Sequence, residues 1–339
     1  MFDLSQYIDV ALVWYVLIAT AVFLYVLLDG FDLGVGILFP FAPSDKCRDR
    51  MMSSIAPFWD GNETWLILGG GGLFAAFPMA YAILMPAFYV PIIVMLLGLI
   101  LRGVSFEFRF KARERSRKIW DYAFHFGSII ATFSQGMVLG AFVQGVQVSG
   151  RSYGGGMFDW LSGFSLMTGL ALVFGYALLG ATWLIMKTED ITQDWARRCA
   201  GYLFAYVAFF MGMVSLVSPI MNDHIRELWF SRPNIFLLQP LPMLSVLFFF
   251  LLWRDIRHKN DNRPFFLSQG IFLTNYIGLG ISTWPWLVPF EITFRRAAAA
   301  PESQSLMLAG TVFLLPIVLA YTGYCYYVFR GKSSHDSTY

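Results

Sequence analysis

The chain is 339 residues long, and its composition excludes a water-soluble protein. Hydrophobic residues make up 57% of it and charged residues only 14%, with a mean hydropathy of +0.59, whereas a soluble domain carries about 25% charged residues. The formal net charge of +2 is too small to indicate a nucleic-acid partner. Because its 34 Phe and 11 Trp are spread from end to end, we interpret residues 1–339 as one polytopic membrane domain.

Nine apolar segments are long enough to cross the hydrocarbon core, which takes roughly 20 helical residues. The sequence therefore predicts an all-α integral membrane protein with nine transmembrane helices. The first segment is long for one span, which favours a tilt or an interruption. In chain order the segments are 10–39, 51–75, 77–101, 119–146, 158–186, 199–219, 235–253, 265–289 and 305–329.

Basic residues are concentrated in alternate connections between these segments. Nineteen of the 24 Lys and Arg residues lie in 40–50, 102–118, 187–198, 254–264 and the C-terminal tail. Connections rich in Lys and Arg stay in the cytoplasm, so the N-terminus is predicted outside and the C-terminus inside. The apolar run that follows Met1-Phe2-Asp3-Leu4 is too long for a signal-peptide core, so we expect it to remain as the first helix.

Two short acidic motifs lie inside predicted spans. Asp29 and Asp32 belong to the first, and Asp60 and Glu63 to the second. An acidic side chain near the bilayer centre costs roughly 2.5–3.5 kcal/mol on insertion scales, so it usually faces a protein interior, a partner or a water-filled path. The members of each pair are three residues apart and therefore share a helix face. With a rise of about 1.5 Å per residue, all four fall near the midplane or in the inner half of the bilayer.

Further charged residues extend this pattern toward the cytoplasm. Glu107 and Asp121 lie at the predicted inner ends of the third and fourth spans, within the basic connection that contains Arg102 and Arg109. Buried carboxyl groups close to one another can hold and release protons near neutral pH, so the pattern suggests a proton relay. The structural alternative is that each acid pairs with Arg102 or Arg109, or satisfies a helix break at a nearby glycine.

Metal and haem chemistry have weak support in this sequence. No His follows either acidic pair at the spacing that a dimetal carboxylate bundle needs, and no Cys-x-x-Cys occurs. His224, His258 and His335 are predicted in loops or the tail, which leaves His125 as the single candidate within a helix, whereas a low-spin haem takes two axial ligands. We therefore expect this chain to hold neither a metal ion nor a haem.

Several motifs together resemble subunit II of cytochrome bd-type quinol oxidases, the cyanide-insensitive type included. The resemblance spans nearly the whole chain in order and is densest in the first 130 residues. Thr64 and Ser105 depart from the commoner Val and Ala of the family, and neither position is a carboxylate. The matching stretches are Asp29 to Gly36, Ser54 to Leu66, Leu101 to Arg109, Trp120-Asp121 with Gly127-Ser128, and Pro316 to Tyr327.

The resemblance implies two four-helix bundles plus one peripheral helix, paired with a homologous subunit I in the bacterial cytoplasmic membrane. Subunit I would carry two b-type haems, one haem d and the quinol-oxidising loop. The complex would oxidise quinol and reduce dioxygen to water with protons from the cytoplasm, generating a proton-motive force without pumping. Small single-helix accessory subunits, membrane lipids and a structural quinone are further partners that this family resemblance allows.

The resemblance also implies residue roles. Asp60, Asp29 and Asp32 match acidic positions attributed to proton delivery or subunit contact, and Trp65 lies where an oxygen route has been proposed. Our main hypothesis is that Asp60, supported by Glu63 and the Asp29/Asp32 pair, passes cytoplasmic protons toward the haems of subunit I. Two other classes stay open: a scaffold that only stabilises its partner, and a stand-alone proton-coupled transporter.

Overall fold

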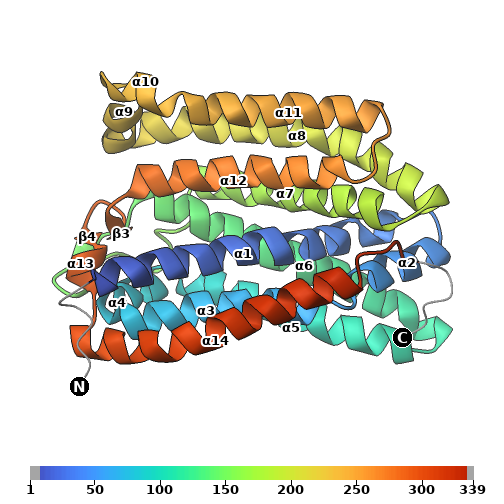
Figure 1. The fold of residues 1–339 in the computed structure, drawn as a ribbon, viewed down its shortest axis with the longest axis horizontal. Coiled ribbons are helices and arrows are strands. Elements are labelled where there is room, and N and C mark those ends of the chain that lie inside the picture. Colours follow the sequence, from blue (N-terminus) through green and yellow to red (C-terminus); the bar gives the residue numbers. More distant parts are fainter. Residues whose placement is uncertain (1–7, 334–339) are drawn as a thin grey trace.

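The computed structural model describes residues 8–333, which form a layered assembly of long helices (Figure 1). Seven of the described helices are long and apolar enough to cross a membrane, which confirms a multi-pass helical membrane protein. They are α1 (Val10–Leu38), α5 (Tyr89–Lys111), α6 (Glu114–Gln144), α7 (Gly163–Lys187), α8 (Asp190–Met221), α11 (Pro240–Arg257) and α14 (Pro301–Val328).

Two more helices occupy predicted spans without being as apolar. α3 (Trp59–Ala76) begins with Asp60, Asn62 and Glu63, and α12 (Arg263–Thr283) carries several polar side chains. The count of nine spans therefore stays a prediction. The remaining elements are η2 (Phe39–Phe41), α2 (Asp45–Ile55), α4 (Pro78–Ala87), α9 (Asp223–Phe230), α10 (Asn234–Leu238), α13 (Phe294–Ala297), β1 (Val148–Ser149), β2 (Ser152–Tyr153), β3 (Trp286–Val288) and β4 (Ile292–Thr293).

Four predicted segments have wrong boundaries. One of them, 199–219, lies in α8, which begins nine residues earlier, at Asp190. The segment 51–75 is divided between α2 and α3, because Pro57 disfavours helix in the residue before it. The segment 77–101 is divided at Phe88, and α5 then continues to Lys111, so Arg102 and Arg109 lie within a helix and not in a loop. The segment 265–289 ends as α12 at Thr283 and continues into β3. α1, in contrast, shows no interruption.

The helices are stacked in four layers, with α1 near the middle (Figure 1). α8 and α11 lie side by side at one edge, α7 and α12 follow, and α3, α5 and α14 lie beyond α1 and α6. α1 contacts α3, α6 and α7. Its carboxylates are therefore enclosed by helices from both sides of the molecule.

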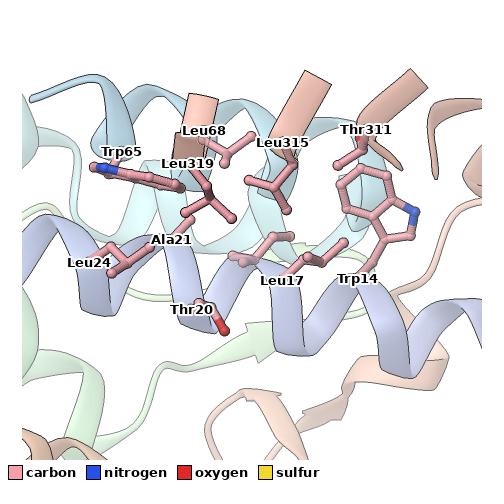
Figure 2. A pocket seen from close by; sticks show the side chains of 11 residues that line it. Trp14, Leu17, Thr20, Ala21, Leu24, Trp65, Leu68, Thr311, Leu315 and Leu319 are labelled. Carbon is pink, nitrogen blue, oxygen red and sulfur yellow. The ribbon is translucent and has the colours of Figure 1, made fainter. Parts of the chain in front are cut away.

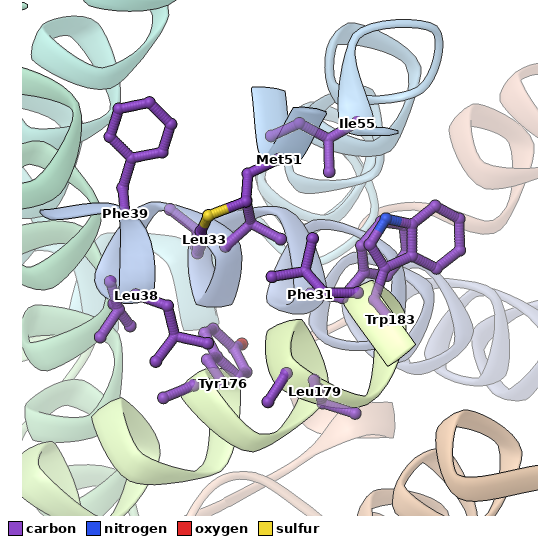
Figure 3. Close-up of a cluster of buried hydrophobic side chains, with 14 of the residues drawn as sticks. Phe31, Leu33, Leu38, Phe39, Met51, Ile55, Tyr176, Leu179 and Trp183 are labelled. Carbon is purple, nitrogen blue, oxygen red and sulfur yellow. The ribbon is translucent and has the colours of Figure 1, made fainter. Parts of the chain in front are cut away.

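Glycine allows α1 and α7 to approach one another at backbone distance. A Cβ atom built on Gly34 would lie 1.8 Å from the carbonyl oxygen of Tyr176, and one on Gly180 would lie 2.4 Å from the carbonyl carbon of Gly34. Beside this contact Phe31 stacks on Trp183 with ring centroids 4.1 Å apart (Figure 3). Because the two helices are this close, the part of α1 that carries Asp29 and Asp32 lies in a buried core.

α14 is mostly exposed but is fastened at both ends. At its start, Trp14 Nε1 donates to the carbonyl of Gln304, whose own amide donates to the carbonyl of Ala76. At its end, Lys187 Nζ donates to the carbonyls of Phe329 and Gly331, at 2.5 and 3.2 Å. These contacts fix where Tyr326, in the last turn of α14, enters the core.

Lys332 adds a contact to Asp261, in the turn between α11 and α12. Burial raises the pKa of Asp261, but its hydrogen bonds with Lys332 and Gln193 and the charges of Lys332 and Arg197 outweigh burial and hold the pKa below its ordinary value. The carboxylate is therefore ionised at neutral pH and tethers the end of the described chain.

We expect Gly34→Ala to destabilise the protein by about 1–3 kcal/mol, because the added methyl group overlaps the backbone of α7. The measurement is the thermal unfolding midpoint of the detergent-solubilised protein. Gly70→Ala is the matched control: nothing lies within 4 Å of a Cβ there, so its midpoint should equal or exceed that of the wild type. Equal midpoints for the two variants would contradict the close α1–α7 contact.

We expect the contact between Asp261 and Lys332 to be lost in acid. Since the pKa of Asp261 in the folded protein lies below the ordinary value of 3.8, the stabilisation is complete at neutral pH and is lost as the pH falls through the folded pKa. It should amount to less than about 1 kcal/mol, because both side chains are partly exposed. Limited proteolysis of the tail should be faster in Asp261→Asn than in the wild type at pH 7, and equally fast below pH of about 3.

Candidate functional site

Three carboxylates converge on one guanidinium in the interior of the chain. We call Asp29, Asp32, Asn62, Glu63 and Arg102 the Arg102 cluster. Arg102 Nη2 lies 2.9 Å from Asp29 Oδ1 and 3.9 Å from Asp32 Oδ2, and its Nη1 donates to Glu63 Oε2 at 3.2 Å. Asp29, Asp32 and Arg102 are completely buried, and the Glu63 side chain is 27% exposed. The cluster thus joins α1, α3 and α5 and reaches the surface only at Glu63.

Asn62 connects this cluster to the end of α14. Its Nδ2 donates to Asp32 Oδ2 at 2.7 Å and to the carbonyl of Leu28 at 3.3 Å. Its Oδ1 accepts from the Tyr326 hydroxyl at 3.0 Å, and the Tyr326 ring stacks on Phe58. The amide is therefore held from both sides, which fixes the orientation of the Asp32 carboxyl.

The charges of the Arg102 cluster do not balance. Three ionised carboxylates against one guanidinium would leave two excess negative charges in a buried site, and each uncompensated charge there costs several kcal/mol. A buried carboxyl escapes this cost by taking up a proton. The cluster is therefore suited to hold protons, which a fully paired set of ions is not.

Asp60 lies outside the cluster. Our hypothesis grouped it with Glu63, Asp29 and Asp32, but its side chain is exposed at the start of α3 and forms no ion pair with the side chains described in residues 8–333. α3 is helical through Gly61, so Asp60 does not satisfy a helix break there. It lies one helical turn before Glu63, at the surface next to the only exposed member of the cluster.

A second, balanced ionic group lies near the predicted cytoplasmic end. Arg109 donates from Nε to Asp121 at 2.6 Å and from Nη1 to Asp49 at 2.7 Å, and Arg117 lies 3.8 Å from Asp49. Two carboxylates face two guanidinium groups, and together they connect α2, α5 and α6. Asp121 is therefore paired with Arg109, and its place in a proton path stays a prediction. Glu107 is exposed on α5 and belongs to neither group.

Trp65 lines an apolar cavity of about 60 Å³ between α1, α3 and α14 (Figure 2). The indole is 3% exposed and packs with Ala21 and Tyr25. Trp65 and Trp14 lie at opposite ends of the cavity, with leucines of α1 and α14 between them. The oxygen route expected at Trp65 stays a prediction.

Two of the described histidines pack against aromatic rings, and the absence of a haem from this chain stays a prediction. His125 Nδ1 lies 3.3 Å from the carbonyl of Gly36, and the ring packs edge-on against Phe41. His224 is not in a loop as predicted but in the short helix α9, with its ring 5.4 Å from that of Phe290; His335 lies outside the described residues. Among the side chains that the structure describes, no three His, Cys, Asp or Glu residues are arranged to hold a metal ion.

The sequence also matches known proteins along most of its length. Residues 10–329 match the family described as cytochrome bd terminal oxidase subunit II. The chain belongs to this family. It is 30% identical to the cytochrome bd ubiquinol oxidase subunit 2 of Bacillus subtilis over 333 residues, which covers 95% of this chain and 96% of the relative.

Two further similarities agree with this family assignment. The cytochrome bd-I ubiquinol oxidase subunit 2 of Escherichia coli K12 is 30% identical over 360 residues, covering 96% of this chain and 95% of the relative. The bd oxidase structure from Geobacillus thermodenitrificans superposes with a TM-score of 0.71 at 17% identity, over 96% of this chain and 100% of that one. The latter similarity concerns the fold. The resemblance inferred from the acidic motifs is confirmed.

Several polar residues that pair inside this subunit II fold were not predicted from the sequence. Asn62 lies in the stretch Ser54 to Leu66 that matches the family, but its role depends on Tyr326, which is 264 positions away. Asp49 and the fully buried Asp255, which pairs with Arg263 at 3.1 Å, lie at or beyond the ends of predicted spans. In the sequence, the one indication of a role for Asp49 and Asp255 was their position beside basic residues. That position does not distinguish a buried ion pair from a solvated loop.

We expect Arg102→Leu to destabilise the protein by about 3–5 kcal/mol, since it leaves three carboxylates without a cation. The measurement is the yield and thermal midpoint of the purified protein at pH 7. The control is Arg226→Leu, whose ion pair with Asp223 is exposed on both sides and should be worth less than about 1 kcal/mol. Similar losses in both variants would show that Arg102 is not the charge on which the core depends.

Proposed function

We propose that this chain is the second subunit of a quinol:oxygen oxidoreductase of the aerobic respiratory chain. In this proposal it stabilises a haem-bearing subunit I in the bacterial cytoplasmic membrane and delivers cytoplasmic protons for reduction of dioxygen to water. The relatives named as ubiquinol oxidase subunits support the assignment of the complex. We further propose the full arrangement of nine spans in two four-helix bundles plus one peripheral helix, α14, with the C-terminus in the cytoplasm.

The observation that carries the proton-delivery role is the excess of carboxylates around Arg102. The Arg109 group pairs two carboxylates with two guanidinium groups, so its charges balance. The Arg102 cluster instead has two more acids than cations and reaches the surface at Glu63. Exposed Asp60 precedes Glu63 by one turn, so we propose the order Asp60, Glu63, then the buried Asp29/Asp32 pair.

A scaffold role is the second candidate, and a specific contact favours it. Arg102 ties α1, α3 and α5 together, and Tyr326 extends the same network to α14. Loss of any member would loosen four helices. The two roles differ in what they require: the scaffold needs the hydrogen bonds, whereas proton delivery needs groups that can ionise.

The test compares Glu63→Gln and Asp60→Asn in the assembled oxidase, with partner haem absorption as the measure of assembly. We expect Glu63→Gln to assemble normally and to lower quinol-driven oxygen consumption at least about a hundredfold, the lower end of what a positioned proton-transfer group contributes. Asp60→Asn should give a smaller loss, because it acts at the surface. Asp194→Asn removes an exposed carboxylate on the same predicted side and should match the wild type.

Two other results would decide against proton delivery. Normal oxygen consumption and normal voltage generation in proteoliposomes containing Glu63→Gln would contradict it directly. Loss of haem-loaded complex in Glu63→Gln, with normal turnover of whatever complex remains, would favour the scaffold.

A further inference from the structure

The segment 254–263, where α11 ends and α12 begins, has more cations around it than anions. Its two carboxylates, Asp255 and Asp261, each meet two cationic groups within 3.3 Å. Two further cations of the segment form no ion pair with the side chains that the structure describes. The imbalance is the reverse of that in the Arg102 cluster. The six cations are Arg197, Arg254, Arg257, Lys259, Arg263 and Lys332.

Asp255 holds Arg254 and Arg263 next to one another at the surface. Its side chain is 1% exposed, whereas those of Arg254 and Arg263 are 39% and 57% exposed. Arg254 donates from Nε and Nη2 to Asp255 Oδ1, both at 3.3 Å, and Arg263 Nε lies 3.1 Å from Oδ2. Within residues 8–333, Arg254 Nη1 and both terminal nitrogens of Arg263 donate to no other group. One buried anion therefore fixes two guanidinium groups and leaves donors of each for a second anion.

The charge of this pair is not compensated elsewhere in the segment. Two guanidinium groups on one carboxylate leave one excess positive charge. The negative end of α11 offsets only about half a charge. Arg257 adds a further cation, and its guanidinium lies 4.3 Å from the centre of the Trp253 ring. The surface here is therefore suited to bind an anion.

Exposed aromatic side chains indicate how deep in the membrane the two arginines lie. Trp253 directly precedes Arg254, and Phe266 follows Arg263 by three residues; both rings are exposed. Aromatic side chains are enriched where the hydrocarbon core meets the lipid headgroups. The segment also belongs to a connection rich in Lys and Arg, on the predicted cytoplasmic side. The guanidinium pair is therefore expected at the level of the phosphate groups of the inner leaflet.

An apolar stripe on α11 leads away from Arg254 into the membrane. Met243, Leu247 and Phe250 are exposed and lie at spacings of four and three residues, and Arg254 continues this series by four. These positions share one helix face. α11 is one of the helices apolar enough to span a membrane, and most of it is not covered by the rest of the chain. One face thus offers an apolar surface for acyl chains and a cation where the span ends.

The place of α11 in the molecule favours lipid over a protein partner. α8 and α11 form one edge of the layered assembly, whereas α3 and α14 lie at the opposite edge (Figure 1). In the function proposed above, subunit I receives protons by way of Glu63 on α3, which would put the partner at that opposite edge. Only this step rests on the proposed function. The edge formed by α8 and α11 is then left to face the bilayer.

We propose that Arg254 and Arg263, held together by Asp255, bind the phosphate group of an anionic phospholipid whose acyl chains lie along α11. The planar fork of a guanidinium matches two phosphate oxygens at once. Basic sites between transmembrane helices on the cytoplasmic side bind anionic headgroups. A phospholipid with one net negative charge also compensates the one excess charge of the arginine pair.

The experiment is native mass spectrometry of the purified, assembled oxidase titrated with dioleoylphosphatidylglycerol. Arg263→Gln should weaken binding of the first lipid about fivefold, the usual effect of one basic side chain near an anionic membrane surface. Asp255 stays paired with Arg254 in this variant, so the fold is kept. The matched control is Arg113→Gln, which removes an exposed arginine between α5 and α6 on the same predicted side and should bind like the wild type.

Unchanged lipid binding in Arg263→Gln, or equal weakening in Arg263→Gln and Arg113→Gln, would overturn the proposal, because the arginine pair would then be no better than any surface charge. Haem absorption of the partner measures assembly of each variant. Should Arg263→Gln fail to assemble, Arg254→Gln replaces it, since Asp255 then stays paired with Arg263. The same fivefold weakening is expected.

Two further probes decide the class of ligand. Dioleoylphosphatidylcholine has the same acyl chains and a phosphate but no net charge, so it should bind the wild type more weakly than dioleoylphosphatidylglycerol. Equal affinity for the two lipids would overturn recognition of an anion. Inorganic phosphate, added at constant ionic strength, should leave the bound lipid in place because it has no acyl chains. Displacement of the lipid by inorganic phosphate would indicate a site for a soluble anion and overturn the lipid assignment.

Discussion

The arrangement of this subunit depends on one buried cation. Arg102 lies on α5 and contacts carboxylates of α1 and α3, and it is completely buried. A guanidinium placed in a membrane interior without partners would be prohibitively expensive, so the three helices must assemble around it in one register. Its planar fork serves several acceptors at fixed angles, which a lysine could not do. The position of the acidic motifs in the sequence follows from that constraint.

Contacts between the surrounding helices hold the buried part of the Arg102 cluster in place. Gly34 and Gly180 allow α1 and α7 to meet at backbone distance, while Lys187 fixes the end of α14 and so the approach of Tyr326 to Asn62. These elements come from distant parts of the sequence. The polar groups can therefore keep short, directed hydrogen bonds in an apolar core, where water would otherwise compete for them.

Much of this arrangement was predictable from the sequence, and the failures have physical reasons. Hydropathy identified the long helices and helix spacing placed Asp29 and Asp32 on one face, because both signals are local. The predicted end of the third span was wrong because Arg102 and Arg109 were assigned to a loop. Only their ion pairs with other helices make these two residues tolerable inside α5.

The sequence alone did not distinguish Asp60 from Asp32, because the exposure of the Asp60 side chain depends on which face of α3 the other helices cover. The fold was needed to connect Asn62 with Tyr326 and Gln135 with Tyr25, because these hydrogen bonds join residues more than a hundred positions apart.

Asp60 is exposed whereas Asp29 and Asp32 are buried, so these carboxyl groups differ in how they can exchange protons. An exposed carboxylate exchanges protons with its surroundings quickly, but it is not held in a fixed relation to an acceptor. Asp29 and Asp32 have the opposite properties, because their environment is fixed and shielded. Glu63 is partly exposed and still bonded to Arg102, so it belongs to both environments. In the proposed proton path, entry would therefore depend most on Glu63, and the buried pair would determine how strongly a proton is retained.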